Sequence, residues 1–346
     1  MPTTLRDIAE RVGTSEATVS LVLNGRQFHR VSQKMRERIE EVARELNYRP
    51  NRQAQLLAGG KTKTVAVLVN RLLNQFFAEY LSVLESELSK SGYHAVPFET
   101  LSQPDRAEKL LGMIDQRLCD AIIALEYTGN PERSTSRGSK FPLTVRVEVF
   151  GEHADPAGTA GAVHVDYKPA TDRLFHVFHE AGARCVGLLT DTRHDLNLPP
   201  VQRSARAKCQ AETLAELGLF SSPTQCVSLS QESPLNAWAH ATEELFKQHP
   251  EIDCLLVHNA TVIPAVLHQL SVMGRTPGRD LAVATYDDPI SARWLGGGLT
   301  VVREPITDVA STLVSQTLER LGVSQPQAQG RHEAELVVRP SSSLVR

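Results

Sequence analysis

The sequence contains no apolar run long enough to cross a bilayer. Its first residues, MPTTLRDIAE, place Arg6, Asp7 and Glu10 where a secretory signal needs an apolar stretch. These two absences predict a cytoplasmic protein without a membrane partner. The chain has 346 residues, which exceeds the length at which one hydrophobic core usually stops growing, so we expect more than one domain.

Cysteines and catalytic motifs are equally sparse. The five cysteines show no CxxC pair and no zinc-like spacing, and an odd number cannot all pair within one chain. We expect them to be reduced and mostly buried, and we expect neither a metal nor a cofactor. The sequence also lacks GxSxG, a Walker-type phosphate loop, GxGxxG and HExxH. No catalytic residue is therefore assigned, and the chain is predicted not to be an enzyme.

The charged residues are unevenly distributed along the chain. Residues 1–63 contain 12 Lys and Arg against 7 Asp and Glu, whereas residues 64–346 contain 25 against 33. A basic segment joined to an acidic body is typical of a polyanion-binding module attached to another domain. The same asymmetry also fits a merely solvated surface, so the motifs have to distinguish the two.

The basic segment has the periodicity of three short helices. Apolar residues recur at helical spacing in three runs and predict the buried face of each helix: Leu5, Ile8, Ala9 and Val12, until Gly13 interrupts them, then Val19, Val22 and Leu23, and then Met35, Ile39, Val42, Ala43 and Leu46. Ser15 can cap a second helix, and Ser32 can cap a third and longer one that Pro50 ends. Three helices can enclose a small core, which we expect to be only marginally stable by itself.

Helix, tight turn and helix predict a helix-turn-helix, in which outward residues near the start of the second helix meet base edges in the major groove. Those residues are Ser15, Glu16, Ala17, Thr18 and Leu21. Glu16 can accept a hydrogen bond from cytosine, whereas Ala17 and Leu21 offer only apolar contacts. We therefore expect little direct reading of the bases. The alternative is an ordinary three-helix bundle with a solvated polar face.

Residues 50–60 predict a short helix that needs a partner. Asn51 can cap it, Ala and Leu favour it, and a glycine pair stops it. Because a helix shorter than about 12 residues is unstable in water, this one would become ordered only against another surface. Paired copies could lie in the DNA minor groove with Leu57, or as second choice Leu56, wedged between base steps. A passive linker is the alternative.

From Thr64 onward, short apolar runs alternate with helical patterns. Strands separated by helices build doubly wound parallel sheets, and the number of repeats predicts two such halves. The strand-like runs are 64–69, 95–99, 119–127, 143–149, 185–191, 254–259 and 280–288, and the helical runs include 76–93, 107–118, 171–183 and 207–218.

These stretches resemble the LacI/GalR family of bacterial regulators nearly from end to end. The matching runs are TLRDIAERVGTSEATVSLVLNG, RVSQKMRERIEEVARELNYRPN and AQLLAGGKTKTVAVLV, in the family's order of head, hinge and first strand. The resemblance implies an all-α helix-turn-helix head plus an α/β periplasmic-binding-protein-like body of two doubly wound parallel-sheet lobes.

The resemblance also implies domain boundaries. The DNA-binding head covers 1–49, the hinge helix and linker 50–61, and the effector-binding and dimerisation domain 62–346. Within that domain, the N-lobe takes about 62–162 and 293–325, and the C-lobe about 163–292 and 326–346.

The family's DNA-contact positions can be carried over one by one. Groove-facing positions fall on Glu16, Ala17 and Leu21, phosphate-anchoring positions on Leu5, Ser15, Thr18, Asn24, Ser32 and Tyr48, and hinge contacts on Asn51, Ala54 and Leu57. Leu21 departs from members that have Arg at this position. The loss of that possible guanine contact places more weight on DNA shape and on the hinge.

The resemblance places an effector in a cleft between the lobes, at the carboxyl ends of the strands. Arg206 could form a forked pair with a carboxylate or phosphate, and Asp287 could accept from sugar hydroxyls or pair with an amine, although either could be structural. The implied contact residues are Asn74, Phe76, Arg206, Asn259, Asp287 and Glu304.

Several of the cleft positions depart from the family pattern. Gln75, Cys209, Ala260 and Glu304 stand where members usually have Pro, Gly, Asp and Gln. The effector is therefore left open among a sugar, a phosphosugar, another polar metabolite or none.

The leading hypothesis is a homodimeric repressor that binds a near-palindromic operator. A small-molecule effector changes the affinity of the repressor for DNA, either as an inducer or as a corepressor. A dimer is expected because the chain shows no C-terminal heptad repeat of the kind that a tetramer needs. A pure solute-binding protein would leave the basic head unexplained. An enzyme on the same architecture would need a nucleophile, and no such partner is evident beside His258.

Overall fold

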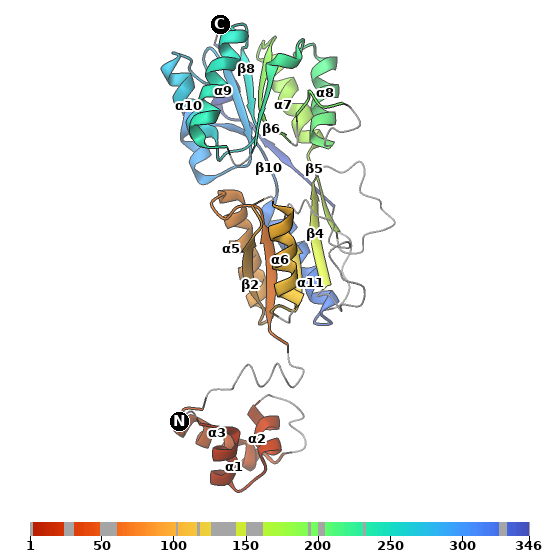
Figure 1. Ribbon diagram of the computed structural model, residues 1–346, viewed down its shortest axis with the longest axis vertical. Helices are drawn as coiled ribbons and strands as arrows, with labels where there is room; N and C mark the ends of the chain where they lie inside the picture. The colour runs from red at the N-terminus through yellow and green to blue at the C-terminus, as the bar shows by residue number, and fades with distance from the viewer. Residues whose placement is uncertain are drawn as a thin grey trace. The chain divides into compact units, whose positions relative to one another are not determined.

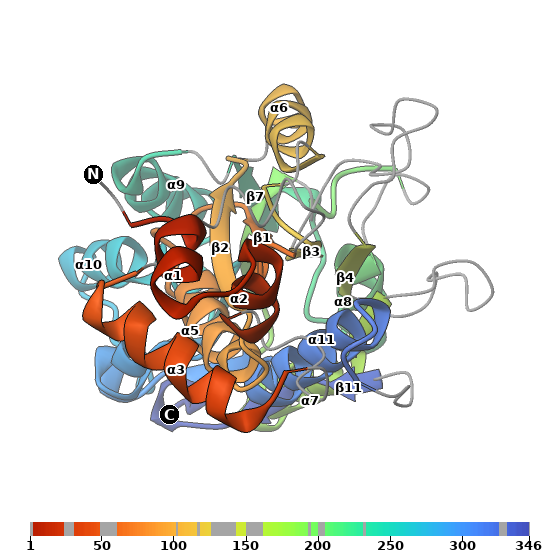
Figure 2. The same cartoon turned by 90° about the horizontal axis from the view of Figure 1, so that it is seen from below.

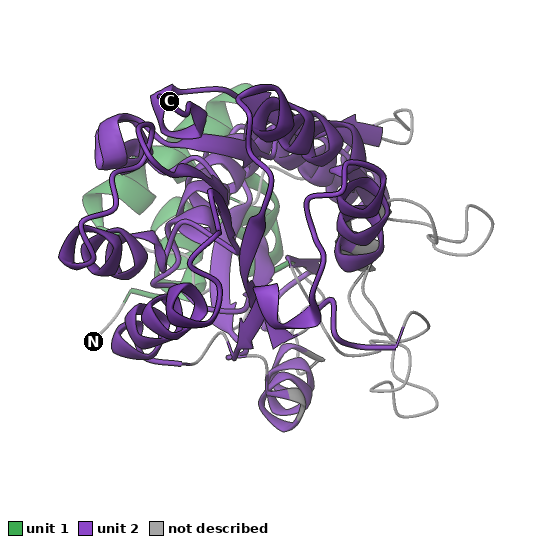
Figure 3. Ribbon diagram, turned by 90° about the horizontal axis from the view of Figure 1, so that it is seen from above, with its two compact units in different colours: residues 1–62 green, residues 63–346 purple. Residues whose placement is uncertain are grey.

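The computed structural model describes two compact units, residues 1–62 and residues 63–346 (Figure 3). No helix among the described residues is long and apolar enough to span a bilayer. The described residues are 3–23, 31–48, 61–101, 103–115, 118–125, 143–149, 162–192, 195–199, 205–230, 233–324 and 331–345.

The first unit contains α1 (Leu5–Val12), α2 (Glu16–Leu23) and α3 (Gln33–Glu45), which pack together (Figure 2). Thr4 and Asp7 form a reciprocal capping box at the start of α1, and Gly13 ends it in the left-handed conformation with φ 76°. The core of this unit consists of Ile8, Ala9, Val19, Val22, Ile39, Val42 and Ala43. The predicted helices and their buried faces are confirmed.

The ends of α3 differ from the prediction in two details. Ser32 precedes the helix as expected, but its side chain makes no capping hydrogen bond with any described residue. The helix ends at Glu45 rather than near Pro50, because Asn47 takes a left-handed conformation (φ 52°) and the Tyr48 N–H donates to the Ala43 carbonyl at 2.9 Å. Asparagine tolerates this conformation better than most residues, so a proline is not needed to stop the helix.

The first sheet of the body has the order β11-β5-β4-β3-β1-β2, and its strand pairs are parallel. Alternate residues of β1 pack against α5 and α11 on one face and against α6 on the other. The strands are β1 (Thr64–Val69), β2 (His94–Glu99), β3 (Ala121–Ala124), β4 (Leu143–Val149), β5 (Ala162–Asp166) and β11 (Arg331–Glu333), and the helices are α5 (Gln75–Ser89), α6 (Pro104–Asp115) and α11 (Ile306–Arg320).

The second sheet has the order β12-β10-β9-β8-β6-β7 and is parallel except for the antiparallel pair β10 and β12. Helices α7 and α8 cover one face, and α9 and α10 cover the other (Figure 1). The strands are β6 (Val186–Asp191), β7 (Cys226–Leu229), β8 (Cys254–Val257), β9 (Ala282–Tyr286), β10 (Thr300–Arg303) and β12 (Glu335–Val337), and the helices are α7 (Lys168–Glu180), α8 (Ala205–Glu216), α9 (Leu235–Gln248) and α10 (Ile263–Val272). Single 3₁₀ turns cover Pro223–Gln225, Ile290–Arg293, Leu295–Gly297 and Pro340–Ser342.

Two doubly wound halves with helices on both faces confirm the predicted α/β class. The sequence patterns had not included α9, α10 or α11, which complete the helical layers of the two sheets. The five cysteines remain thiols, and four of them are buried.

The chain passes between the two sheets at three points: Tyr167 after β5, Glu304 after β10, and Ala334 between β11 and β12. The lobe boundaries expected from the sequence differ from this arrangement, because they place β10, β11 and most of β5 with the opposite lobe. The reason is that the apolar pattern of a strand reports how deeply it is buried and does not report which sheet it joins.

Candidate functional site

The N-terminus of α2 presents the predicted major-groove positions at the surface. The Ser15 hydroxyl oxygen accepts the Thr18 N–H at 3.2 Å, which confirms Ser15 as the cap of this helix. Ser15, Glu16 and Ala17 are exposed, whereas Thr18 and Leu21 are partly buried. The first turn of α2 therefore has polar and apolar groups accessible to a partner.

The other predicted DNA contacts have mixed surroundings. Leu5 and Tyr48 are partly buried against the core of the head, and burial raises the pKa of Tyr48. Ser32 is exposed at the start of α3. Contact of these residues with phosphate stays a prediction. Asn24, Asn51, Ala54 and Leu57, together with the hinge helix expected at 50–60, lie outside the described residues.

The three helices of the head have almost no net charge. Residues 3–23 and 31–48 contain 6 Lys and Arg against 7 Asp and Glu. Ion pairs join Arg6 to Glu10 at 2.9 Å and Arg38 to Glu41 at 2.7 Å. The positive excess of residues 1–63 therefore comes from residues that flank the helices, namely Arg26, Arg30, Arg49, Arg52, Lys61 and Lys63.

The body contains a groove with a volume of about 1080 Å³. The start of α5, the loop after β9 and the segment between β10 and α11 form its walls. Four of the six predicted effector residues line it: Asn74, Phe76, Asp287 and Glu304. Arg206 and Asn259 are not among its lining residues, so the structure does not gather the whole predicted set in this groove.

Three of the predicted effector residues also have a local structural role. The Asn74 side-chain oxygen accepts the Phe76 N–H at 3.1 Å and caps α5, and the Asn259 oxygen accepts the Thr261 N–H at 2.9 Å. Asp287 has φ 70° and donates its N–H to the Val302 carbonyl at 3.0 Å. The two asparagine side chains fix the backbone of their turns, as Asn commonly does, and a main-chain bond holds the backbone at Asp287.

Arg206 lies on α8 and is only 8 % exposed. Its guanidinium carbon is 4.0 Å from the centre of the Tyr286 ring and 5.7 Å from that of Tyr167, and Nη1 lies 3.2 Å from His258 Nδ1. The Tyr286 hydroxyl in turn accepts from the Gln210 amide at 2.9 Å. Stacking on aromatic rings suits the planar guanidinium, and this burial gives Arg206 a packing role of its own.

Glu304 is the most enclosed of the predicted effector residues, with 5 % exposure. Its two carboxylate oxygens accept hydrogen bonds from different tyrosines: Oε1 from the Tyr80 hydroxyl, and Oε2 from the Tyr167 hydroxyl at 2.5 Å. Burial first, and then the negative charge of Glu304, raise the pKa of both tyrosines well above their usual value. Both hydroxyls are therefore protonated donors at neutral pH.

Acidic side chains outnumber basic ones along the groove. Asp288 forms a bidentate pair with Arg339 at 2.7 and 2.8 Å, and Arg303 binds Glu335 at 2.7 Å. Burial and the nearby Asp288 raise the pKa of Glu79. The lining contains six acidic residues (Glu79, Asp287, Asp288, Glu304, Asp308 and Glu335) and two basic ones (Arg293 and Arg303).

The sequence interpretation missed the aromatic residues that surround these charges. Tyr80 lies one helical turn after Phe76 on α5, and their rings are 5.1 Å apart with an edge-to-face tilt of 68°. Tyr167 directly follows β5. A tyrosine at the end of a buried strand and another on the buried face of a helix were available as signals, but neither pattern indicates a partner that lies far away in the sequence.

Comparison with known families gives two matches along the chain. Residues 4–51 match the family described as bacterial regulatory proteins, lacI family. Residues 175–342 match a periplasmic binding protein-like domain.

Curated relatives match over nearly the whole length. A ribose operon repressor from Haemophilus influenzae is 25% identical over 319 residues, which cover 92% of each chain. An HTH-type transcriptional repressor, PurR, from Aliivibrio salmonicida is 23% identical over 331 residues, again 92% of each chain.

Solved structures of regulators share the fold. A lac repressor dimer bound to operator and the anti-inducer ONPF superposes with a TM-score of 0.78 at 19% identity, covering 99% of this chain and 100% of that one. A LacI-family transcriptional regulator from Silicibacter pomeroyi gives a TM-score of 0.76 at 22% identity with the same coverage. The chain thus combines a head of the lacI family of bacterial regulatory proteins, at residues 4–51, with a periplasmic-binding-protein-like body, and the relatives that match it along most of its length are repressors.

Proposed function

We propose that the protein is a sequence-specific DNA-binding transcriptional repressor that acts as a homodimer and whose operator affinity is modulated by a small molecule in the body. The observation on which this depends is the pairing, in one chain, of a lacI-type head with a body that contains a groove of about 1080 Å³. The ribose operon repressor and the PurR repressor match this chain along 92% of their own length. The predicted DNA and effector contacts are the residues through which we expect this activity.

DNA attraction in this proposal depends on the basic residues that flank the helices. The described helices have nearly balanced charge, while six of the basic residues of the head flank them. Phosphate contacts supply most of the affinity and its salt dependence, and base contacts supply sequence preference. We therefore expect Glu16 and Leu21 to influence which duplex is preferred, and the flanking arginines to set how strongly any duplex is held.

The charge of the groove favours an effector that is neutral or cationic. A phosphorylated sugar would bring negative charge toward Glu79, Asp287 and Glu304, which form part of a lining with six acidic and two basic residues. Like charges at close range in a partly desolvated site disfavour binding. Among the effectors that the sequence leaves open, we expect sugars and amines to bind more tightly than phosphosugars.

Two other classes of protein fit these observations less well. A pure solute-binding protein would leave the lacI-type head without a role. An enzyme would need a reacting group in the groove, and three of its six lining carboxylates, those of Asp288, Glu304 and Glu335, already form ion pairs or hydrogen bonds. We propose a cytoplasmic regulator without catalytic activity.

The DNA part is tested by selecting a duplex from random sequences with the full chain and measuring its affinity against salt. We expect a steep negative slope of log affinity against log salt, and Arg49→Ala with Arg52→Ala should reduce that slope by about 1 for each lost phosphate contact. Arg38→Ala, which removes an arginine paired with Glu41, is the matched control and should leave the slope nearly unchanged. Failure to select any duplex would refute the proposal.

The effector part is tested by thermal-shift screening of the full chain with neutral sugars, amines and phosphosugars. A ligand that binds the folded state raises the unfolding temperature, and the rise grows with the logarithm of the ligand concentration above its dissociation constant. We expect a hit in the first two groups, and the same compound should change the affinity for the selected duplex. A phosphosugar as the strongest ligand would overturn the charge argument while leaving the regulator assignment intact.

A further inference from the structure

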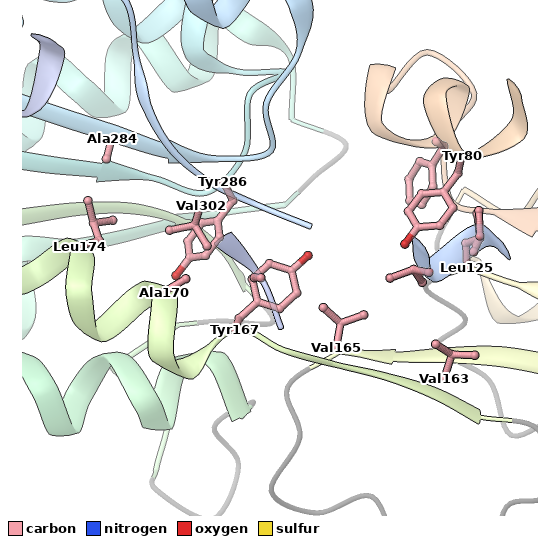
Figure 4. Packing of buried hydrophobic residues seen from close by; sticks show 14 of the residues in the cluster. Tyr80, Leu125, Val163, Val165, Tyr167, Ala170, Leu174, Ala284, Tyr286 and Val302 are labelled. Carbon is pink, nitrogen blue, oxygen red and sulfur yellow. The ribbon is translucent and has the colours of Figure 1, made fainter. Parts of the chain in front are cut away.

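Tyr80, Glu304 and Tyr167 bring together three separate parts of the body. Tyr80 lies on α5 over the first sheet, Tyr167 lies where the chain leaves the first sheet after β5, and Glu304 lies where it leaves the second sheet after β10. Figure 4 shows the hydroxyl ends of Tyr80 and Tyr167 directed toward each other. All three side chains are at most 5 % exposed. We call this group the carboxylate triad.

A carboxylate is the side chain that such a site needs. An ionised carboxylate accepts on both oxygens and donates on neither, so both tyrosine hydroxyls can donate to the Glu304 side chain at the same time. An amide of the same shape has one carbonyl oxygen, and its NH₂ group would face the second tyrosine as a donor. The hydroxyl hydrogen of that tyrosine would then lose its carboxylate acceptor in a buried place, where an unsatisfied polar group is costly.

The triad continues into the packing of the second sheet. The ring of Tyr167 lies 6.2 Å from that of Tyr286, and the Arg206 guanidinium lies over both rings. Tyr286 ends β9 and is hydrogen-bonded to Gln210 on α8. The position of Glu304 is therefore linked to α5 on one side and, through Tyr167, to β9 and α8 on the other.

We propose that the carboxylate triad is a positioning device that fixes the two crossover segments against α5 and transmits occupation of the groove from one lobe to the other. Glu304 lines the groove, so a ligand that brings a hydroxyl or ammonium donor to its carboxylate competes with Tyr80 and Tyr167 for the same oxygens. Binding thereby changes the contact that relates the lobes. Tyr80 and Tyr167 are positioning residues in this scheme, and the regulatory consequence rests on the proposed function.

The positioning role is tested in the full chain by amide hydrogen exchange, which needs no ligand. The peptides to follow contain residues 162–180 and 300–320, because local opening of the crossovers exposes their amides. Hydrogen bonds to charged groups are strong, so we expect Glu304→Gln to speed exchange in both peptides by about tenfold or more. Tyr80→Phe and Tyr167→Phe should each speed it by a smaller factor.

Tyr93 provides a matched control for the loss of a hydroxyl. Its side chain is fully buried in the same lobe as Tyr80, and its hydroxyl has no hydrogen-bond partner among the described residues. Tyr93→Phe should therefore leave exchange in the two crossover peptides unchanged. Equal acceleration by Tyr93→Phe and Tyr80→Phe would mean that any buried tyrosine hydroxyl matters, and it would overturn the assignment.

A double-variant cycle separates the triad from a general loosening of the body. If the Tyr80 hydroxyl acts through Glu304, Tyr80→Phe should accelerate exchange less in the Glu304→Gln background than in the unaltered chain. Fully additive effects, or no effect of Glu304→Gln in either peptide, would refute the triad. Since exchange is measured without DNA, this result stands apart from the duplex selection that tests the repressor assignment.

The transmission step is tested with the duplex selected by the unaltered chain and the sugar or amine found by thermal shift. We expect Tyr80→Phe and Tyr167→Phe to reduce the ratio of duplex affinities measured without and with that compound, while Tyr93→Phe preserves it. A ratio unchanged in all three variants would limit the triad to a structural role and overturn the transmission. Absence of any compound effect in the unaltered chain would instead count against the proposed effector response.

Discussion

The head and the body of this protein place their polar residues in opposite ways. In the head, Ser15, Glu16 and Ala17 are exposed at the start of α2, above a core of seven buried residues. In the body, Arg206 and Glu304 are at most 8 % exposed and are already engaged with aromatic side chains. A surface that reads a large partner can leave its contact groups in water, whereas a site inside a fold has to satisfy its polar groups before any ligand arrives.

The two regions also differ in the size of their hydrophobic cores. The head buries only a small apolar cluster, while the main cluster of the body continues across both sheets, from Val65 to Ala334. Small domains bury a smaller fraction of their surface and are correspondingly marginal. A single change should therefore be able to unfold the head while the body stays folded, and the predictions below use this difference.

The largest effect is expected from removing the head. A chain that begins at residue 63 should lose detectable binding to the selected duplex, because the residues matched to the lacI family lie at 4–51. Its body should still unfold cooperatively, as circular dichroism during heating would report. Residual affinity of this shortened chain for the duplex would refute the assignment of DNA binding to the head.

A buried substitution in the head should come next. Ile39 is fully buried in α3, and truncation of such a side chain costs about 2–5 kcal/mol. That cost is comparable to the whole stability of a small domain, so Ile39→Ala should remove the head transition from a calorimetric scan and abolish duplex binding. The body transition should stay in place, and Glu40→Ala on the exposed face of the same helix is the control.

Much of the fold could be predicted from the sequence, because local patterns determine local structure. The run 64–69 became β1 without change, and the helical spacing around Ile8, Val19 and Val42 identified the buried face of each head helix. The lobe membership of β5, β10 and β11 could not be read in this way. A strand's neighbours in a sheet are chosen by the path of the whole chain, and an apolar run fits either sheet.

The candidate site was predictable to a similar degree. The family resemblance pointed to Asn74, Phe76, Asp287 and Glu304, and these line one groove. The residues that hold Glu304 were missed because Tyr80 is 224 positions away and Tyr167 is 137 positions away in the sequence. Only the substitution of Glu for the usual Gln hinted that the surroundings of this position differ, and it did not say which donors require the second oxygen.

A smaller effect is expected when the stacked arginine of the body is changed. Arg206→Lys keeps the charge but removes the planar group over Tyr286, and such contacts contribute about 1–2 kcal/mol when desolvated. We expect the free energy of unfolding of the body to fall by that amount, so that the body unfolds at a lower denaturant concentration. The unfolding transition of the head should not change. Arg173→Lys on the exposed side of α7 is the control. Equal shifts for the two variants would show that the stack adds nothing to stability.

The smallest effect concerns the titration of the two tyrosines that bind Glu304. Burial first, and then the Glu304 charge, raise the pKa of Tyr80 and Tyr167 well above the ordinary value of 10.0, with Arg206 acting in the opposite direction on Tyr167. A pKa that is higher in the folded than in the unfolded state contributes stability that is fully present below about pH 10 and is lost as pH rises from there through the folded value. Alkaline solution should therefore destabilise the body.

Glu304→Gln sharpens this prediction, because it removes the charge and leaves the burial. The pKa of Tyr80 and Tyr167 should fall toward the ordinary value but stay above it, since burial is the larger cause. Ultraviolet absorbance of tyrosinate against pH measures the change, and Tyr93→Phe, which removes one of the six tyrosines, identifies the contribution of a buried tyrosine outside the triad. If Glu304→Gln and the unaltered chain titrated identically, the carboxylate would not be the acceptor of these hydroxyls in solution, and the contrast between an open head and a satisfied body would lose its clearest example.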